Sequence, residues 1–229
     1  DAHLQAYSCS LVRGALDDAL NGQLDFLDGT VFPHTCDSIQ RLSDIWRLNT
    51  GFDFHLDLVL PVKLNTQSAE KYMQAVLKKF RKDLEAGLKV NITAPKLKKA
   101  IQTFNEIRSN LQRLYTLRSE RAAPFSSSDL HAIVRASLVM DRDELGKRLG
   151  EICSRLEGYH HDPRIDKKPL VLSGGICSIP DIYQQIEDAG ATVVGDDFCT
   201  GSRHFAGTID LRDDPLRAIG QRYFERINC

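Results

Sequence analysis

Apolar positions in the first part of the chain follow helical and strand periodicities in turn. Residues 10–20 have a helical pattern and lead into a short apolar run at 29–32, which we predict to be a strand ended by Pro33. A second helix is predicted to open at 36–38, because apolar side chains then recur at helical spacing, and residues 54–60 predict a second strand. This strand–helix–strand order favours a parallel sheet.

The middle of the chain, residues 67–156, has four helical stripes of apolar residues and no convincing strand pattern. Thr93 stands where the second of these helices would begin, and the serines at 126–128 stand where the third would begin. Both are usual places for capping side chains. The fourth stripe includes Cys153, so we predict that this cysteine lies in the core.

The strand and helix pattern returns after a polar linker at 159–168. The segment from Ser178 to Asp181 has the spacing of a capping box, with a proline in the first turn of the helix that follows. The predicted elements are a strand at 169–173 that breaks at Gly174-Gly175, a helix that ends at Ala189 before Gly190, a strand at 191–195 and a final helix at 215–227.

These patterns predict an α/β fold in which parallel-sheet α/β segments bracket a helical insertion. The predicted divisions are a first α/β segment at 1–66 with Cys9 and Cys36, a helical insertion at 67–158, and a second α/β segment at 159–229 with Cys199.

The charge balance excludes some classes of partner. Lys and Arg number 30 against 31 Asp and Glu, so the net charge of -1 gives no bulk attraction to nucleic acid or to an anionic membrane. Basic runs at 78–82 and 96–99 fall inside helical patterns and are interpreted as solvated helix faces. No stretch approaches the roughly 18 apolar residues of a membrane span, and residues 1–20 lack a signal-peptide pattern. We therefore expect a cytoplasmic protein with no nucleic-acid or membrane partner. Because the chain starts at Asp1 without a methionine and ends in mid-pattern, we also expect a fragment.

The six cysteines are the candidate chemistry. Cys36, Cys177 and Cys199 each follow a predicted strand, and ligands of parallel sheets bind at the carboxyl ends of strands. Cys9 stands just before the first predicted helix, so all four are candidates for one rim. Thiolates there suit zinc or an iron–sulfur cluster, but the close Cys-x-x-Cys pair typical of zinc is absent. The spacing alone does not require a metal, and scattered core cysteines stay an alternative.

Two other kinds of site receive less support from the sequence. His34 lies two residues before Cys36 and His204 five residues after Cys199, but such local closeness does not by itself make a Cys–His pair. Gly174-Gly175 before a helix is compatible with an anion site, but it lacks the spacing of either glycine-rich nucleotide motif. A tight strand-to-helix turn is the favoured interpretation of these glycines.

Three stretches together resemble the 2-hydroxyacyl-CoA dehydratase and benzoyl-CoA reductase family. They are the segment from Cys9 to Gly14, the segment from Phe32 to Trp46 with the strand that ends at Leu60-Pro61, and the segment from Ser173 to Arg203. The helical section, including Asn105-Glu106-Ile107-Arg108, is also similar, so the resemblance covers nearly the whole chain. Each motif alone is weak, whereas the combination is specific.

The resemblance implies a [4Fe–4S] cluster on three cysteines, which correspond to Cys9, Cys36 and Cys199, with one iron left to a non-protein ligand or to substrate. It also implies an anaerobic heterodimer with a homologous second subunit, an acyl-CoA substrate, and an ATP-dependent iron–sulfur activator protein that delivers one low-potential electron. In the dehydratases this electron turns a 2-hydroxyacyl-CoA into a ketyl radical that expels its hydroxyl group. In the reductases a related delivery dearomatises benzoyl-CoA.

From this resemblance we expect a 2-hydroxyacyl-CoA dehydratase subunit. A benzoyl-CoA reductase subunit is the alternative, and a non-catalytic electron-relay or scaffold subunit is the second alternative. Cys177 lies outside the family pattern and is kept as a substitute ligand. Asp37, Asp196 and Asp197 flank the cysteines, and they are interpreted either as groups that set the local field and position a proton or as helix caps and strand-end turns.

Overall fold

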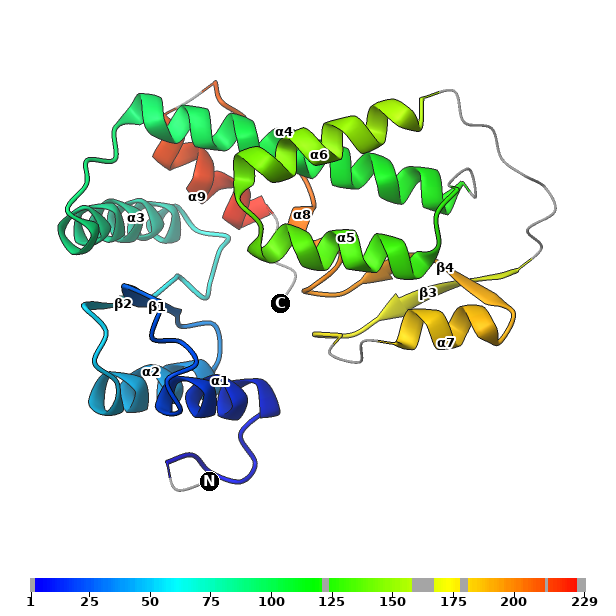
Figure 1. Cartoon of the computed structure of the whole chain (residues 1–229). Coiled ribbons are helices and arrows are strands. Elements are labelled where there is room, and N and C mark those ends of the chain that lie inside the picture. Colours follow the sequence, from blue (N-terminus) through cyan, green and yellow to red (C-terminus); the bar gives the residue numbers. More distant parts are fainter. Residues whose placement is uncertain (1–2, 121–123, 158–166, 178–180, 213, 226–229) are drawn as a thin grey trace. The chain divides into compact units, whose positions relative to one another are not determined.

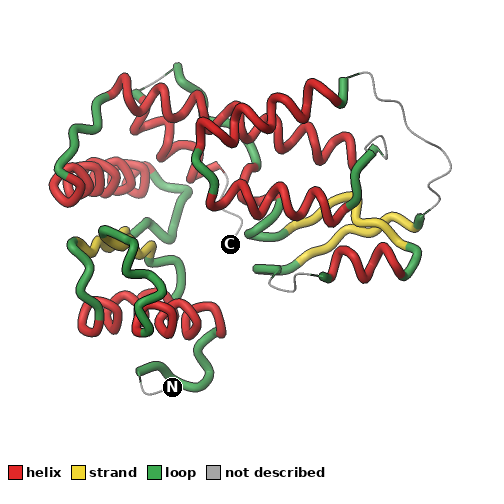
Figure 2. Tube along the Cα trace, viewed as in Figure 1, coloured by secondary structure: helices red, strands yellow, loops and turns green. Residues whose placement is uncertain are grey.

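A computed structural model of the chain describes residues 3–120, 124–157, 167–177, 181–212 and 214–225. Within these ranges the chain consists of helices and short parallel strands (Figures 1 and 2), which confirms the predicted α/β class. It forms two compact units, residues 1–94 and 95–229.

The first unit is built on one pair of parallel strands. β1 (Gly29–Pro33) pairs with β2 (Phe54–Leu58), with Gly29 opposite Phe54 and Pro33 opposite Leu58. Helices α1 (Ser10–Leu20) and α2 (Asp37–Asn49) pack against each other, and α3 (Gln67–Leu88) packs against β2. The two strands and their connecting helix are the parallel unit that the sequence predicts.

The core of the first unit follows directly from sequence periodicity. α1 buries Val12 and Leu16, and α2 buries Leu42 and Trp46, each pair one helical turn apart. Phe32 from β1 completes this cluster, with its ring centroid 5.3 Å from that of Trp46 in an edge-on arrangement.

Three helices of the second unit share one core. They are α4 (Ala94–Ser119), α5 (Ser127–Val139) and α6 (Arg142–Arg155). With α3 they confirm the four helices predicted between 67 and 156, and Ser126 forms the predicted cap as a full capping box with Asp129. Cys153 is 3% exposed, so its prediction as a core residue is confirmed. The buried members of this core are Ile107, Leu111, Leu114, Leu130, Val134, Leu145, Leu149, Cys153 and Phe205.

A second pair of parallel strands lies beside this helical core. β3 (Lys168–Ser173) pairs with β4 (Ala191–Asp197), and α7 (Ile182–Asp188) connects them. Gly190 has a φ of +85° between α7 and β4, a conformation that favours glycine and ends the helix where the sequence predicts. The short α8 (Ser202–Phe205) and the last helix, α9 (Pro215–Glu225), follow.

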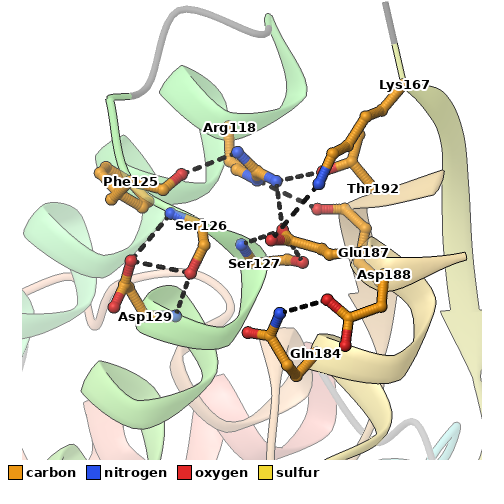
Figure 3. A network of polar contacts seen from close by, with 11 residues as sticks. Arg118, Phe125, Ser126, Ser127, Asp129, Lys167, Gln184, Glu187, Asp188 and Thr192 are labelled. Carbon is orange, nitrogen blue, oxygen red and sulfur yellow. Dashed lines mark hydrogen bonds and ion pairs between the residues drawn. The ribbon is translucent and has the colours of Figure 1, made fainter. Parts of the chain in front are cut away.

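A buried polar network joins this strand pair to the helices (Figure 3). Arg118 of α4 and Glu187 of α7 form an ion pair at 3.1 Å, and each side chain is only 10% exposed. Ser127 at the start of α5 donates to the same carboxylate, and Thr192 of β4 accepts from the guanidinium. Four elements of the second unit therefore meet at one pair of opposite charges.

The structure differs from the sequence-based elements at a few boundaries. β4 continues to Asp197, two residues beyond the predicted end, because its backbone pairs with Leu172 and Ser173 of β3. Helix α8 was not predicted, and Asp181 is the N-cap of α7 without a capping hydrogen bond from its side chain. The compact units divide between residues 94 and 95, so α3 belongs to the first unit and α4 to α6 belong to the second. The remainder of the proposed capping box at 178–180, most of the linker at 159–168 and the end of the last helix lie outside the described residues.

Candidate functional site

Cys9 and Cys36 occupy equivalent positions in the first unit. Each is the N-cap residue of a helix, α1 for Cys9 and α2 for Cys36, and each has an extended backbone. Both residues are exposed, and neither side chain makes a capping hydrogen bond, so neither sulfur is used to close its helix. The N-terminal end of a helix favours a negatively charged group, which suits a thiolate-ligated metal cluster.

A cavity of about 390 Å³ lies against the sequence neighbours of both cysteines. Ser8, which precedes Cys9, and Asp37, which follows Cys36, both line it. The N-terminal segment and the first turn of α2 therefore line the same cavity of the first unit. Its lining residues are His3, Leu4, Gln5, Tyr7, Ser8, Asp37, Ser38, Gln40, Arg41 and Ile45.

A polar network holds the segment that leads from β1 to Cys36. His34 Nε2 lies 2.9 Å from Asp57 Oδ1 on β2, and Ser43 Oγ donates to the same carboxylate oxygen at 2.5 Å. Burial alone would raise the pKa of Asp57, but the hydrogen bonds from Ser43 and His34 outweigh it and hold that pKa below its ordinary value. His34 thus ties the segment before Cys36 to the neighbouring strand.

Cys199 lies in the second unit, two residues after β4. Its backbone N–H donates to the carbonyl of Gly175 at 2.8 Å, which ties the loop after β4 to the loop after β3. Arg203 Nη1 donates to the Cys199 sulfur at 3.8 Å, and two bonds of 2.6 Å to the Asp197 carboxylate hold that guanidinium in place. Cys199 is therefore a half-buried sulfur with a fixed cation beside it.

Asp196 shapes the turn that carries Cys199. Its carboxylate accepts from the Tyr115 hydroxyl and, at 2.8 Å, from the backbone N–H of Ser202. A Cβ added at Gly201 would overlap this carboxylate, so a larger residue there would have to displace Asp196 from these contacts. Burial first, and then the charge of Asp196, raise the pKa of Tyr115. Of the two interpretations of Asp196, the contacts support a strand-end turn.

Cys177 and Cys153 have different surroundings. The Cys177 backbone N–H donates to Thr200 Oγ1 at 3.4 Å, so the substitute ligand lies in a loop joined to the Cys199 loop. Cys153 donates its thiol hydrogen to the Asn110 carbonyl at 3.7 Å, and burial raises its pKa. A buried thiol of this kind behaves as a core side chain rather than as a ligand.

The proposed ligand set is divided between the two units, with Cys9 and Cys36 in one and Cys199 in the other. Across the part of the chain that the structure describes, no three His, Cys, Asp or Glu side chains gather into a metal-binding group. The donor chemistry itself fits an iron–sulfur cluster, because all three cysteines are free thiols with partly or fully exposed residues. Their convergence on one cluster stays a prediction.

Two residues that the structure makes prominent received no role from sequence reasoning. Arg203 is the last residue of the stretch from Ser173 to Arg203 that resembles the family. Its spacing of four residues from Cys199 could have predicted their contact, because residues four apart often meet within one turn. Tyr115 lies 81 positions before Asp196 and offered no local signal.

The fold and these thiols define an α/β protein with free cysteines at strand ends and helix N-termini. The family model of the 2-hydroxyglutaryl-CoA dehydratase D-component matches residues 1–229, and the chain therefore belongs to this family, as the resemblance predicted. No helix in the described ranges is long and apolar enough to cross a membrane.

Relatives of the chain include polypeptides of both reductases and dehydratases. A benzoyl-CoA reductase subunit of Thauera aromatica is 28% identical over 221 residues, which cover 96% of this chain and 57% of the relative. The (R)-2-hydroxyglutaryl-CoA dehydratase beta subunit of Acidaminococcus fermentans is 24% identical over 97% of the chain and 59% of the relative. The (R)-phenyllactyl-CoA dehydratase beta subunit of Clostridium sporogenes is 20% identical over 98% of the chain and 60% of the relative. The chain thus spans less than two thirds of the length of these relatives.

Proposed function

We propose that this chain is the cluster-binding part of a 2-hydroxyacyl-CoA dehydratase subunit, with Cys9, Cys36 and Cys199 as ligands of one [4Fe–4S] cluster. The observation that carries the proposal is the family match over residues 1–229, which includes all three cysteines. The free thiols at helix N-termini and at a strand end support the choice of ligands.

The chain's own residues would orient and tune the site. When bound, the cluster supplies a one-electron relay and, at an iron without a protein ligand, a Lewis acid for a thioester or hydroxyl oxygen. Arg203 donates a hydrogen bond to Cys199, and Asp196 and Gly201 fix the turn on which that ligand lies. Such contacts to a ligand sulfur tune a cluster, so Arg203 is a positioning residue rather than a catalytic one. No side chain is proposed as catalytic.

The proposed reaction is the elimination of water from a 2-hydroxyacyl-CoA through a ketyl radical, after one-electron reduction by an ATP-dependent iron–sulfur activator. A homologous second subunit would complete the enzyme, and the names of the relatives as subunits support that expectation. The proposed location is the cytoplasm.

A benzoyl-CoA reductase subunit is the second candidate. The identity to the benzoyl-CoA reductase relative is 28%, against 24% and 20% for the two dehydratase relatives, and this difference favours keeping it. A protein that only relays electrons or acts as a scaffold is the candidate from another class.

Anaerobic reconstitution tests the cluster. We expect a brown protein with roughly four irons per chain, and we expect Cys199→Ser to lose most of that iron. Cys153→Ser is the matched control and should keep it, with Cys153→Ala as a second control because alanine suits an apolar core. A colourless, iron-free wild type would refute the proposal. If Cys177→Ser removes the iron and Cys199→Ser does not, the assignment of the third ligand is wrong.

Turnover separates the candidate reactions. The full-length protein with its partner and activator should convert a 2-hydroxyacyl-CoA to the enoyl-CoA, measured by chromatography under strict anaerobiosis. Dearomatisation of benzoyl-CoA without dehydration would support the reductase instead. A cluster-loaded complex that processes neither thioester would support the relay or scaffold role.

A further inference from the structure

The carboxylate of Asp57 is hydrogen-bonded to residues on both sides of Cys36 in the first unit. Its Oδ1 atom accepts from His34 Nε2 at 2.9 Å and from Ser43 Oγ at 2.5 Å. His34 precedes Cys36 by two residues, whereas Ser43 lies on α2, the helix of which Cys36 is the N-cap. Asp57 itself lies on the neighbouring strand β2. One oxygen atom therefore holds both the segment that leads into Cys36 and the helix that follows it.

The backbone around Cys36 is held at the same two places. The His34 N–H donates to the Leu58 carbonyl of β2 at 3.0 Å, and the Cys36 carbonyl accepts from the Gln40 N–H at 3.1 Å. The Cys36 side chain makes no capping hydrogen bond, so no such bond orients its sulfur. The direction in which the thiol points therefore depends on the backbone that Asp57 holds on either side.

A chain of buried donors directs the Ser43 hydroxyl toward Asp57. Ser43 has one hydroxyl hydrogen and gives it to Asp57, so its oxygen accepts from His55 Nε2 at 2.9 Å. Burial lowers the pKa of His55, and in the neutral ring Nδ1 accepts from the Thr30 hydroxyl at 3.4 Å. Ser43 is 2% exposed and Thr30 is 9% exposed. Water therefore does not readily replace these partners, and the direction of the Ser43 hydroxyl is fixed.

Asp57 is not itself part of the apolar core of this unit. Its side chain is 40% exposed, and it lies outside the buried cluster formed by α1, β1 and α2. Its replacement therefore opens no cavity among the core side chains. The effect of such a replacement should be concentrated on the two hydrogen bonds that meet at Oδ1.

We propose that Asp57 is a positioning residue for Cys36, which presents the cysteine sulfur in one orientation by holding His34 and Ser43 on a single oxygen. Contacts behind a metal ligand orient that ligand, and an oriented ligand loses less entropy when it binds. The benefit to a [4Fe–4S] cluster rests on the proposed function, whereas the positioning of the thiol does not. Asp57 acts through its neighbours and is not a catalytic residue.

Hydrogen exchange of the iron-free full chain tests the positioning. Asp57→Ala removes both hydrogen bonds, so the amides of His34 and Gln40 should exchange roughly tenfold faster, measured by mass spectrometry on peptides that cover residues 33–41. Asp57→Asn keeps an oxygen without the charge, and its exchange should fall between that of the alanine variant and that of the wild type. Asp53→Ala is the matched control, because it removes an exposed carboxylate just before β2 and should exchange as the wild type does.

The reconstituted chain provides a second, spectroscopic measurement. Asp57→Ala should release iron to a chelator faster than the wild type, and its electron paramagnetic resonance signal should broaden because Cys36 has more than one orientation. Ala69→Gly weakens the buried face of α3 in the same unit without touching the Asp57 network, so it is the control for stability alone. It should keep the release rate and the signal of the wild type.

The outcomes separate this proposal from the proposed function. Unchanged exchange of His34 and Gln40 in Asp57→Ala would overturn the positioning role, and so would equally fast iron release in Ala69→Gly. Urea unfolding shows whether each variant is folded, and Asp57→Asn tests the same contacts if the alanine variant is not. A wild type that binds no iron would refute the cluster, while the exchange of the iron-free chain would still decide the role of Asp57.

Discussion

Replacing Glu187 with alanine removes the acceptor at the centre of the buried network in the second unit (Figure 3). Its Oε1 atom accepts from Arg118 at 3.1 Å, from the Ser127 N–H at 2.7 Å and from the Ser127 hydroxyl at 2.5 Å. The substitution leaves a guanidinium that is 10% exposed without its counter-charge, and it leaves the first N–H of α5 without an acceptor.

The expected loss in the free energy of unfolding depends on the hydrogen bonds that Arg118 retains in the variant. Breaking a buried pair by removing one partner costs about 3–5 kcal/mol. Arg118 still donates to the carbonyls of Phe125 and Val193, so we expect a loss near the lower end, about 3 kcal/mol. Glu187→Gln keeps an oxygen acceptor and should lose less, about 1–2 kcal/mol. Since the free energy of unfolding of an ordinary domain is roughly 5–15 kcal/mol, the alanine variant should be measurably less stable than the wild type.

Native-state hydrogen exchange with mass spectrometry measures this loss within the second unit, on peptides from β4 and α5. Urea unfolding followed by circular dichroism gives a second value for the free energy of unfolding. Glu157→Ala is the control, because its ion pair with Arg113 is exposed and should contribute only about 0–1 kcal/mol. Exchange rates of Glu187→Ala that match those of Glu157→Ala would show that the buried ion pair contributes no more than the exposed one.

Three further substitutions test the turn, the pH response and the cysteine ligand. Gly201→Ala forces its Cβ against the Asp196 carboxylate and should lower the free energy of unfolding by about 1–3 kcal/mol. Gly150→Ala, inside α6 where a Cβ meets nothing within 4 Å, should instead raise it by up to about 1 kcal/mol, and thermal denaturation measures both. Burial lowers the pKa of His131 from 6.5, so the unfolded chain takes up the proton first, and stability present above about pH 6.5 is lost as the pH falls below it. His131→Phe should therefore reduce the acid loss of hydrogen-exchange protection in the second unit. Arg203→Gln removes a cation that donates to the proposed cysteine ligand, so the reconstituted cluster should keep its iron and have a lower reduction potential, measured by a redox titration followed by electron paramagnetic resonance.

Each of these substitutions has a result that would contradict the reasoning. A melting temperature of Gly201→Ala equal to that of the wild type would show that the turn yields without cost. An unchanged acid response in the phenylalanine variant would mean that another histidine of the second unit carries it, with His204, whose pKa is also lowered by burial, as the next to test. A reduction potential that does not move with Arg203→Gln would show that the guanidinium does not act on the cluster.

Much of the local structure could be predicted from the sequence. The helix at 10–20, the cap at Ser126 and the core position of Cys153 were all predicted and are confirmed. Each depends on contacts between residues three or four apart, and such contacts repeat with the period of the helix. The family was also accessible, because the stretches that carry the resemblance are patterns of residues along the chain, and the family match confirms it.

Only the tertiary structure decided how distant side chains meet. Arg118 and Glu187 lie 69 positions apart, and Tyr115 lies 81 positions from Asp196, so no periodicity connects them. The strand end at Asp197 depended on the partner strand, because a backbone pair across a sheet is chosen by the register of both strands. The contact of Arg142 with the ring of Phe104 formed for the same reason, because the packing of α6 against α4 brings its guanidinium within 5.3 Å of the ring centroid. The order of residues determines which chemical groups a chain carries, and folding decides which of those groups lie close enough to act together.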